Sequence, residues 1–454
     1  MASTEHTVDP PTATNTARPL LMRLHFYAGV LVAPFILVAA ITGALYALAP
    51  SIEQFVYRDI LTVDPAGDPL PLSDQAAAAR SAFPQLDMSG MRPAPTPTES
   101  TRVYFTDPTL GDNMLRAVFV DPHTARVLGD EATWFGYLPL STWLDGLHRH
   151  LNLGEPGRVY SELAASWLWV IGLAGLYLWV IRPAVNRRRD GKRRSGRATT
   201  LNRHGALGVW VLAAMLFLSA TGITWSTYAG AHVSDLRSAM SWQRPALNTA
   251  SGGEHAGHGG HTMSVLDPAT VDFGAVVRAA DAAGVHAPVE VTLPAEPGHG
   301  VAVGELEKPW RLTTNVAAVD PATDRVTSTI DYWRDYSTVA MLADWGIRMH
   351  MGLLFGLLNQ LLLLVVAISI VTLIVLGYRM WWQRRPTRGS AWAVGRPPLR
   401  GGLRRLSPAV AVSLIAAAVA TAWFLPVLGV SLLGFVLVDV VVGTVKARRA
   451  QRLS

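Results

Sequence analysis

The sequence of 454 residues contains no cysteine, and charged residues make up only 16% of it. Without thiolates, the chain can form neither disulfides nor cysteine-ligated zinc, copper or iron–sulfur centres. It also lacks a Walker A motif and a G-x-G-x-x-G motif between a strand and a helix, so no nucleotide-binding module is predicted. No Ser-His-Asp or H-E-x-x-H pattern indicates a hydrolase. Half of the residues are apolar, which together with the low charge is typical of a membrane protein.

Long apolar runs predict six membrane-spanning helices, because about 20 apolar residues cross a bilayer core of about 30 Å as a helix. The first four runs lie at residues 26–52, 163–181, 205–231 and 351–378. A further run, residues 407–445, is broken near Pro426 and Gly429. We interpret it as a hairpin of two short spans, with a single tilted helix as the alternative. No cleavable signal peptide is predicted, because the first run is too long for one.

Basic residues predict the orientation of these spans. Residues 182–203 contain nine Lys or Arg and one acid, and residues 379–405 contain eight arginines and no acid. The positive-inside rule therefore places both segments in the cytoplasm. The acid-rich loops at 51–147 and 232–347 are expected outside, and the basic tail at 446–454 returns to the cytoplasm. We predict a multi-pass protein of the cytoplasmic (inner) membrane with both termini in the cytoplasm.

The two outer loops have similar patterns. Helical composition followed by strand-like runs occurs in both, at residues 73–83, 102–106 and 115–120 of the first loop and 271–283 and 289–293 of the second. Each loop also contains a similar Asp-Pro motif, DPHTARV from Asp121 and DPATDRV from Asp320. Proline fixes φ and aspartate can bond the backbone beyond it, so both motifs predict a turn between strands. We therefore expect a small α+β module in each loop.

Four histidines lie at the ends of the first four apolar runs. His25 and His204 lie on the cytoplasmic side, and His148 and His350 lie on the outer side. Two imidazoles at each face are what an iron porphyrin needs above and below its plane. We predict one haem b between His25 and His204 and a second between His148 and His350. With both axial positions filled, electron transfer is favoured over oxygen chemistry.

Four motifs around these histidines resemble the PepSY-associated transmembrane family. They are RLHFYAG from Arg23, LHRHLNLGEPGR from Leu147, NRHGALGVW from Asn202 and RMHMGLLFG from Arg348. The similarity covers about residues 20–385 and leaves out the C-terminal hairpin. The family includes iron-regulated inner-membrane proteins and ferric-siderophore reductases with two b-type haems. The resemblance implies that the outer loops are PepSY domains, and it supports haem and electron transfer more strongly than any particular acceptor.

His150 is the competitor of His148 as a ligand. The two residues are separated by two positions, so on a helix they point about 200° apart and only one can face the bundle. The family motif falls on His148, which we therefore prefer. Arginines beside both pairs can bind haem propionates: Arg149, Arg158 and Arg348 at the outer face, and Arg23 and Arg203 at the inner face. Interfacial snorkelling explains the inner two equally well.

The His-rich linker at residues 252–263 carries a second metal signal. His255, His258 and His261 lie in a Gly-rich stretch and can gather copper or zinc, with Met263 as a further donor. An unstructured linker with incidental histidines is an equal alternative.

We therefore predict an α-helical integral membrane protein with a four-helix haem-binding core, a C-terminal hairpin and two small α+β PepSY-like extracytoplasmic modules. The predicted order is a disordered lead (1–20), the first span (21–50), the first module (51–147), an outer amphipathic segment with the second span (148–182), a basic loop (183–203), the third span (204–231), the second module (232–347), the fourth span (348–382), a basic linker (383–406), the hairpin (407–445) and a basic tail (446–454).

The predicted function is electron transfer from the inner to the outer haem and on to a ferric siderophore or another extracytoplasmic metal chelate. The electron donor is a quinol or a cytoplasmic reductase. Membrane lipid is a partner and nucleic acid is not, because the net charge of +6 is concentrated in cytoplasmic loops. Two alternatives are a metal or siderophore permease without redox chemistry, and a regulatory or binding protein in which PepSY modules act and the spans are anchors.

Overall fold

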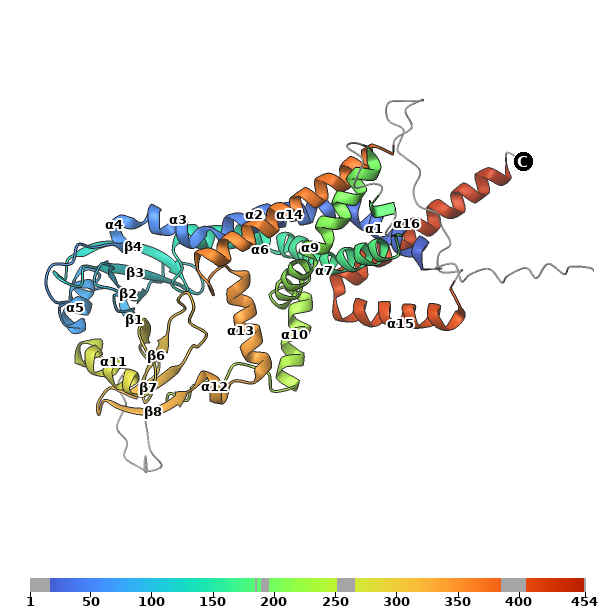
Figure 1. The fold of residues 1–454 in the computed structure, drawn as a ribbon. Coiled ribbons are helices and arrows are strands. Elements are labelled where there is room, and N and C mark those ends of the chain that lie inside the picture. The colour runs from blue at the N-terminus through green and yellow to red at the C-terminus, as the bar shows by residue number, and fades with distance from the viewer. Residues whose placement is uncertain (1–16, 184–185, 189–195, 251–265, 385–405, 453–454) are drawn as a thin grey trace, which may run out of the picture. The chain divides into compact units, whose positions relative to one another are not determined.

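The structure is a computed structural model that describes residues 17–183, 186–188, 196–250, 266–384 and 406–452 (Figure 1). The chain folds into two compact units. The helical unit comprises Met1–Ile41, Leu153–Ser234 and Val365–Ser454, and the sheet unit comprises Thr42–Asn152 and Asp235–Leu364. Each unit is therefore assembled from segments that are far apart in the sequence.

Among the described residues, four helices are long and apolar enough to cross a membrane. They are α7 (Glu155–Val180), α9 (Arg197–Thr224), α14 (Leu357–Trp382) and the Pro426–Val445 part of α16 (Pro426–Gln451). The predicted first span is two helices, α1 (Arg18–Leu31) and α2 (Ala33–Ala47), bent by 57°. Pro34 explains the break, because proline has no N–H to donate inside a helix. With this pair taken as one broken span, the described residues hold five spans, and the protein is a multi-pass membrane protein.

The predicted sixth span is shorter than expected. Helix α15 (Pro408–Phe424) is apolar but has 17 residues. At 1.5 Å per residue it is about 25 Å long, less than a typical bilayer core. The helix ends at Leu425 and Pro426 starts α16, so the predicted hairpin is present and packs α15 against α16.

Packing in the helical unit centres on α7, which contacts α1, α9 and α16. Trp167 of α7 is fully buried, and its Nε1 donates a hydrogen bond to Ser431 Oγ of α16 at 2.8 Å. The hairpin is held at two further points. His232 Nδ1 donates to the Phe424 carbonyl at 3.0 Å, and Arg23 of α1 forms an ion pair with Asp439 of α16.

Eight antiparallel strands form one sheet in the order β4-β3-β2-β1-β5-β6-β7-β8 (Figure 1). The first loop supplies β1 (Asp87–Arg92), β2 (Thr101–Thr106), β3 (Met114–Val120) and β4 (Val127–Trp134), and the second supplies β5 (Val289–Thr292), β6 (Val301–Glu305), β7 (Val316–Asp320) and β8 (Arg325–Ile330). Strands β1 and β5 pair at Gly90↔Thr292 and Met91↔Val291. Each loop thus supplies four strands, and the two halves join in one continuous sheet, which the sequence analysis did not predict. In a four-stranded half alone, β1 or β5 would be an edge strand with unpaired backbone N–H and C=O groups. The pairing of β1 with β5 gives hydrogen-bond partners to both strands.

The two halves share a core on one face of the sheet. Helices α5 (Leu72–Ala82) and α11 (Phe273–Ala282) contact each other and cover buried side chains of both halves. Side chains alternate along each strand. Val103 and Val291 belong to this shared core, whereas Arg102 and Glu290 lie on the opposite face.

The predicted Asp-Pro turns lie at equivalent places, between β3 and β4 and between β7 and β8. Asp121 accepts hydrogen bonds from the N–H of His123 at 2.9 Å and the hydroxyl of Thr124 at 2.7 Å. Asp320 accepts from the N–H of Ala322 at 3.0 Å and the hydroxyl of Thr323 at 2.8 Å. The two similar sequence motifs thus form the same type of turn in both halves of the sheet.

Short helices connect the sheet to the apolar helices. They are α3 (Ala49–Val56), α4 (Arg58–Leu61), α6 (Pro139–His150), α10 (Tyr228–Ala239), α12 (Tyr332–Asp335) and α13 (Thr338–His350), with a single 3-10 turn at Pro268–Thr270. Helix α6 ends where Leu151 adopts a left-handed conformation, φ 53°, which separates it from α7. Helix α13 likewise ends at His350, before α14 begins at Leu357. His148 and His350 therefore lie on short helices that precede the long apolar ones.

Candidate functional site

His25 and His204 form a pair inside the helical unit. Their ring centroids are 6.1 Å apart and the ring planes are inclined by 74°. His25 Nδ1 is 3.0 Å from the carbonyl oxygen of Ile171, and His204 Nδ1 is 3.1 Å from that of Leu373. A carbonyl can only accept, so Nδ1 of each ring carries the proton. Each neutral ring therefore keeps its lone pair on Nε2, the nitrogen left for a ligand bond.

Each of these hydrogen bonds reaches a carbonyl that is followed four residues later by a glycine. Gly175 follows Ile171 in α7, and Gly377 follows Leu373 in α14. In a helix, the carbonyl of one residue lies beside the N–H of the fourth residue after it, so an approaching ring passes over that residue. A Cβ at Gly175 would lie 3.0 Å from Cε1 of His25, whereas one at Gly377 would lie 3.8 Å from Cε1 of His204. An added Cβ at Gly175 would therefore be tight against the His25 ring, whereas one at Gly377 would make an ordinary contact with His204.

His148 and His350 form the second pair, inside the sheet unit. Their ring centroids are 6.2 Å apart with an interplanar angle of 47°. His148 Nδ1 and the hydroxyl of Thr42 are 3.1 Å apart, and the ring of Tyr46 stacks on the His148 ring at 6.4 Å and 14°. A Cβ at Gly43 would lie 2.9 Å from Cε1 of His148. Three residues near the end of α2 thus determine the position of His148: Thr42 and Tyr46 contact its ring, and Gly43 leaves space for it.

His150 takes a different position from its competitor. A Cβ at Gly146 would lie 3.4 Å from Cε1 of His150, so this ring lies against its own helix. The ring that lies against His350 is that of His148.

The predicted propionate-binding arginines have partners in the protein. Arg348 is buried, and its guanidinium donates to Asp344 at 2.6 Å and to the carbonyl of Arg311 at 2.9 Å. Arg149 lies 3.4 Å from Asp145 and 5.2 Å from the centre of the Trp134 ring. Arg23 pairs with Asp439 as described above. Arg158 lies in the first turn of α7, and Arg203 is exposed on α9. Arg23, Arg149 and Arg348 thus each contact a carboxylate of the protein, and their binding of haem propionates stays a prediction.

The predicted metal ligands of the linker, His255, His258 and His261, lie outside the described residues, as does Met263. Within the part of the chain that is described, no group of three or more His, Asp or Glu side chains could hold a metal ion. The histidine pairs are therefore two-donor sites, which suits a metal whose other ligands come from a cofactor.

The spacing of both pairs fits a metal bound between two imidazoles. With a nitrogen–metal bond of about 2 Å and about 1 Å more from nitrogen to ring centre, the two centroids lie about 6 Å apart. The observed centroid distances are 6.1 and 6.2 Å. Each pair thus offers two imidazole rings at a spacing that one metal ion between them would require.

The sequence analysis identified the histidines but not the residues that hold them, namely Thr42, Gly43, Tyr46 and Gly175. The available signal was a glycine inside an apolar run, at positions 43 and 175. Such a glycine lowers helix stability relative to alanine and often has a packing reason.

Residues 22–384 match a family model described as the PepSY-associated TM region. The matched range includes all four paired histidines and ends before the α15–α16 hairpin. A search of curated proteins finds no match to the chain.

Proposed function

The chain belongs to the PepSY-associated TM region family, and we propose that it is a di-haem b electron-transfer protein that reduces an extracytoplasmic ferric chelate. The observation that carries this proposal is the pairing of four histidines into two sites. The ring centroids are 6.1 Å apart in one pair and 6.2 Å apart in the other. His25 and His204 hold the first haem, and His148 and His350 hold the second.

A haem b at each pair supplies one-electron chemistry, because its iron changes between the ferric and ferrous states. The residues of the chain determine how each site works. The hydrogen bonds from His25 and His204 to backbone carbonyls orient both rings and leave Nε2 of each as the nitrogen that would bind a haem iron. An iron held by two histidines would have no coordination site left for oxygen. Buried apolar residues of the helical unit, among them Ala28, Val32 and Trp167, exclude water.

The proposed direction of transfer follows from charge. The basic segments at residues 182–203 and 379–405 place the His25–His204 pair toward the cytoplasm, with both termini on that side. A quinol or a cytoplasmic reductase donates electrons there. The acceptor takes one electron beside the His148–His350 pair, and its Fe(III) becomes Fe(II). Hard oxygen ligands bind Fe(II) less tightly, so the chelate releases its iron.

The test is the visible spectrum and the haem count of the purified protein after haem-replete expression. We expect a Soret band and two haems per chain by pyridine haemochrome. His25→Ala, His204→Ala, His148→Ala and His350→Ala should each leave one haem. His150→Ala and His232→Ala should keep both, because their rings lie against Gly146 and Trp423.

Absence of a Soret band in the wild-type protein would disprove the proposal. Loss of both haems in every single variant would disprove the assignment of two separate pairs. If His148→Ala kept both haems and His150→Ala lost one, the ligand would be His150 instead of His148.

A further inference from the structure

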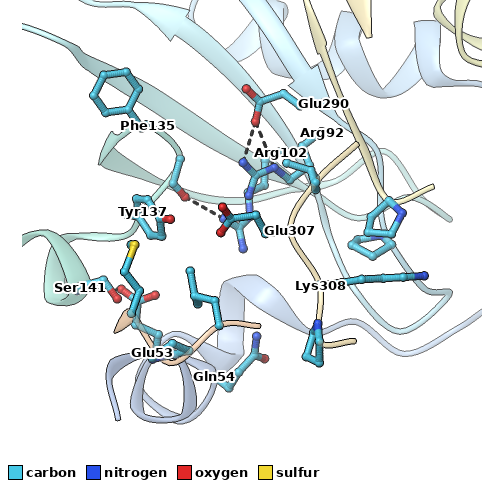
Figure 2. Close-up of a pocket in the computed structure, with 18 of the residues that line it drawn as sticks. Glu53, Gln54, Arg92, Arg102, Phe135, Tyr137, Ser141, Glu290, Glu307 and Lys308 are labelled. Carbon is cyan, nitrogen blue, oxygen red and sulfur yellow. Dashed lines mark hydrogen bonds and ion pairs between the residues drawn. The ribbon is translucent and has the colours of Figure 1, made fainter. Parts of the chain in front are cut away.

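A cavity of about 850 Å³ lies within the sheet unit, and Figure 2 shows residues that line it. It lies on the face of the sheet opposite to the core that α5 and α11 cover. Both halves of the sheet line it, through Arg92 and Arg102 of β1 and β2 and Glu290 and Gly304 of β5 and β6. Cavities of about 300–1,000 Å³ are typical of sites for small molecules. The joining of the two halves at β1 and β5 thus creates a space that neither half encloses alone.

The cavity is lined by two residues that lie beside the outer histidine pair. Tyr46 lines the cavity, and the same ring stacks on His148 at 6.4 Å. Met351, which directly follows His350, also lines it. One aromatic ring therefore separates a molecule in this cavity from an imidazole of the pair.

Most charged side chains on the cavity wall already have hydrogen-bond or ion-pair partners within the protein. Glu290 accepts two hydrogen bonds from Arg92, at 2.6 and 3.2 Å (Figure 2). Glu53 accepts from the N–H of Ser141 at 2.8 Å. Glu305 accepts from Thr313 and from two backbone N–H groups. These groups hold the wall together and are not available to a ligand.

Two cations on the wall form no ion pair within the described part of the chain. Arg102 donates a hydrogen bond to the carbonyl of Gly136 at 3.2 Å and also interacts with Tyr104 and with Glu53. Among the described residues, no carboxylate lies within ion-pair distance of Arg102 or of Lys308. Burial lowers the pKa of Arg102, which means that its positive charge is held at a cost. An anion bound in the cavity would remove that cost.

Two carboxylates remain on the wall, Glu99 and Glu307. Glu99 accepts a hydrogen bond from the hydroxyl of Thr96 at 3.0 Å. The carboxyl of Glu307 lies near Arg102 (Figure 2), and desolvation raises its pKa. The apolar part of a ligand would meet Phe135, Tyr137 and Leu353.

We propose that this cavity binds the electron acceptor and selects an anionic, carboxylate-bearing ferric chelate, whose carboxylates are bound by Arg102 and Lys308. The proposal rests on the proposed function, because the bound iron receives its single electron at the His148–His350 pair. Reduction makes the bound chelate more negative by one charge, and no bond within the chelate has to break in that step.

Binding can be measured separately from reduction, by equilibrium dialysis of the oxidised full-length protein with ferric citrate. We expect Arg102→Gln and Lys308→Gln each to weaken binding about tenfold, the effect of losing one charge-assisted hydrogen bond. Arg102→Lys, which retains the charge, should recover part of the affinity. Arg126→Gln is the matched control, because Arg126 is an exposed arginine in the turn after β3 and does not line the cavity. A cationic ferric trihydroxamate should bind weakly and should not respond to any of these variants.

Two results would overturn the proposal. One is unchanged ferric citrate binding in both Arg102→Gln and Lys308→Gln, with haem content equal to wild type. The other is tighter binding of the cationic chelate than of ferric citrate. Lys308 is exposed, so its variant remains informative if Arg102→Gln fails to fold. Charge-dependent binding without any electron transfer would support the cavity and instead contradict the proposed function.

Discussion

Two glycines, Gly43 and Gly175, determine how closely a histidine ring can approach the neighbouring helix. Only hydrogen occupies the side-chain position, so the ring of His25 can reach the carbonyl of Ile171, four residues before Gly175. The histidines themselves could be predicted from the sequence, because each lies at the end of an apolar run. The glycines could not, because their role depends on which helices face each other, and periodicity does not contain that information.

Gly175→Ala should displace the ring of His25. The added Cβ would lie 3.0 Å from Cε1 of that ring, so either the ring or the helix must shift. We expect loss or weakening of one haem, seen as a lower haem count and an altered spectrum of the remaining low-spin species. Gly29→Ala on the His25 helix is the control, because a Cβ there meets nothing within 4 Å. An unchanged spectrum in Gly175→Ala would contradict the close approach.

Glu307 predicts a pH dependence of stability. Burial raises its pKa in the folded protein above the ordinary value of 4.5; Arg348 lowers it and Asp344 raises it further, with smaller lowering by Arg244 and Arg92. The folded state therefore holds this proton more tightly than the unfolded state, and stability falls as pH rises through the folded pKa.

Glu307→Gln removes this ionisation. The variant and the wild type should therefore melt at similar temperatures near pH 4.5, and the variant should be increasingly more stable toward pH 8. Thermal unfolding in detergent at several pH values checks this. A difference in melting temperature that does not change with pH would show that Glu307 does not titrate in this range.

At the scale of elements, the joint between β1 and β5 is the feature that the sequence did not reveal. Residues 102–106, 115–120 and 289–293 were recognisable as strands from their alternation, and they lie in β2, β3 and β5 or directly after it. Alternation identifies strands but not their partners across a gap of nearly 200 residues. The two loops therefore looked like separate modules, although each half needs the other at its open edge.

Gly90→Ala should weaken this joint. A Cβ at Gly90 would lie 2.4 Å from the backbone oxygen of Val291, so the two strands must separate. We expect a loss of about 1–3 kcal/mol, the usual cost of forcing extra atoms into a packed site. Gly304→Ala in β6 is the control, because the nearest atoms to its Cβ would be side-chain carbons at 3.8 Å. Equal unfolding midpoints of the two variants in urea would argue against the joint.

At the scale of the whole chain, the C-terminal hairpin lies beyond residues 22–384, the range of the family match. The structure nevertheless connects it to the helical unit through Ser431, Phe424 and Asp439. The sequence analysis predicted the hairpin from its apolar run and the break near Pro426. It left Arg23 open between a haem propionate and interfacial snorkelling, because the partner of a charge cannot be known before the helices are placed.

Asp439→Asn should destabilise the helical unit, because it leaves Arg23 without its carboxylate among apolar helices. We expect about 1–3 kcal/mol, less than for a fully buried pair, since the side chain of Asp439 is 36% exposed. The measurement is thermal unfolding followed by tryptophan fluorescence. Asp235→Asn removes an exposed acid and should have little effect. The double variant Arg23→Gln/Asp439→Asn should be more stable than Asp439→Asn alone, because it leaves no unpaired charge. If the double variant were no more stable, loss of the Arg23–Asp439 ion pair would not be the cause of the destabilisation.

The central position of β1 in the sheet also has a consequence for biosynthesis. The ribosome makes residues 87–134 long before residues 289–330, so the first half-sheet exists for a time with β1 as an unpaired edge. Elongation at about 5–20 residues per second makes this interval about ten seconds or more. Through that interval the nascent chain presents a strand edge to any extended peptide nearby, and the completed protein no longer does.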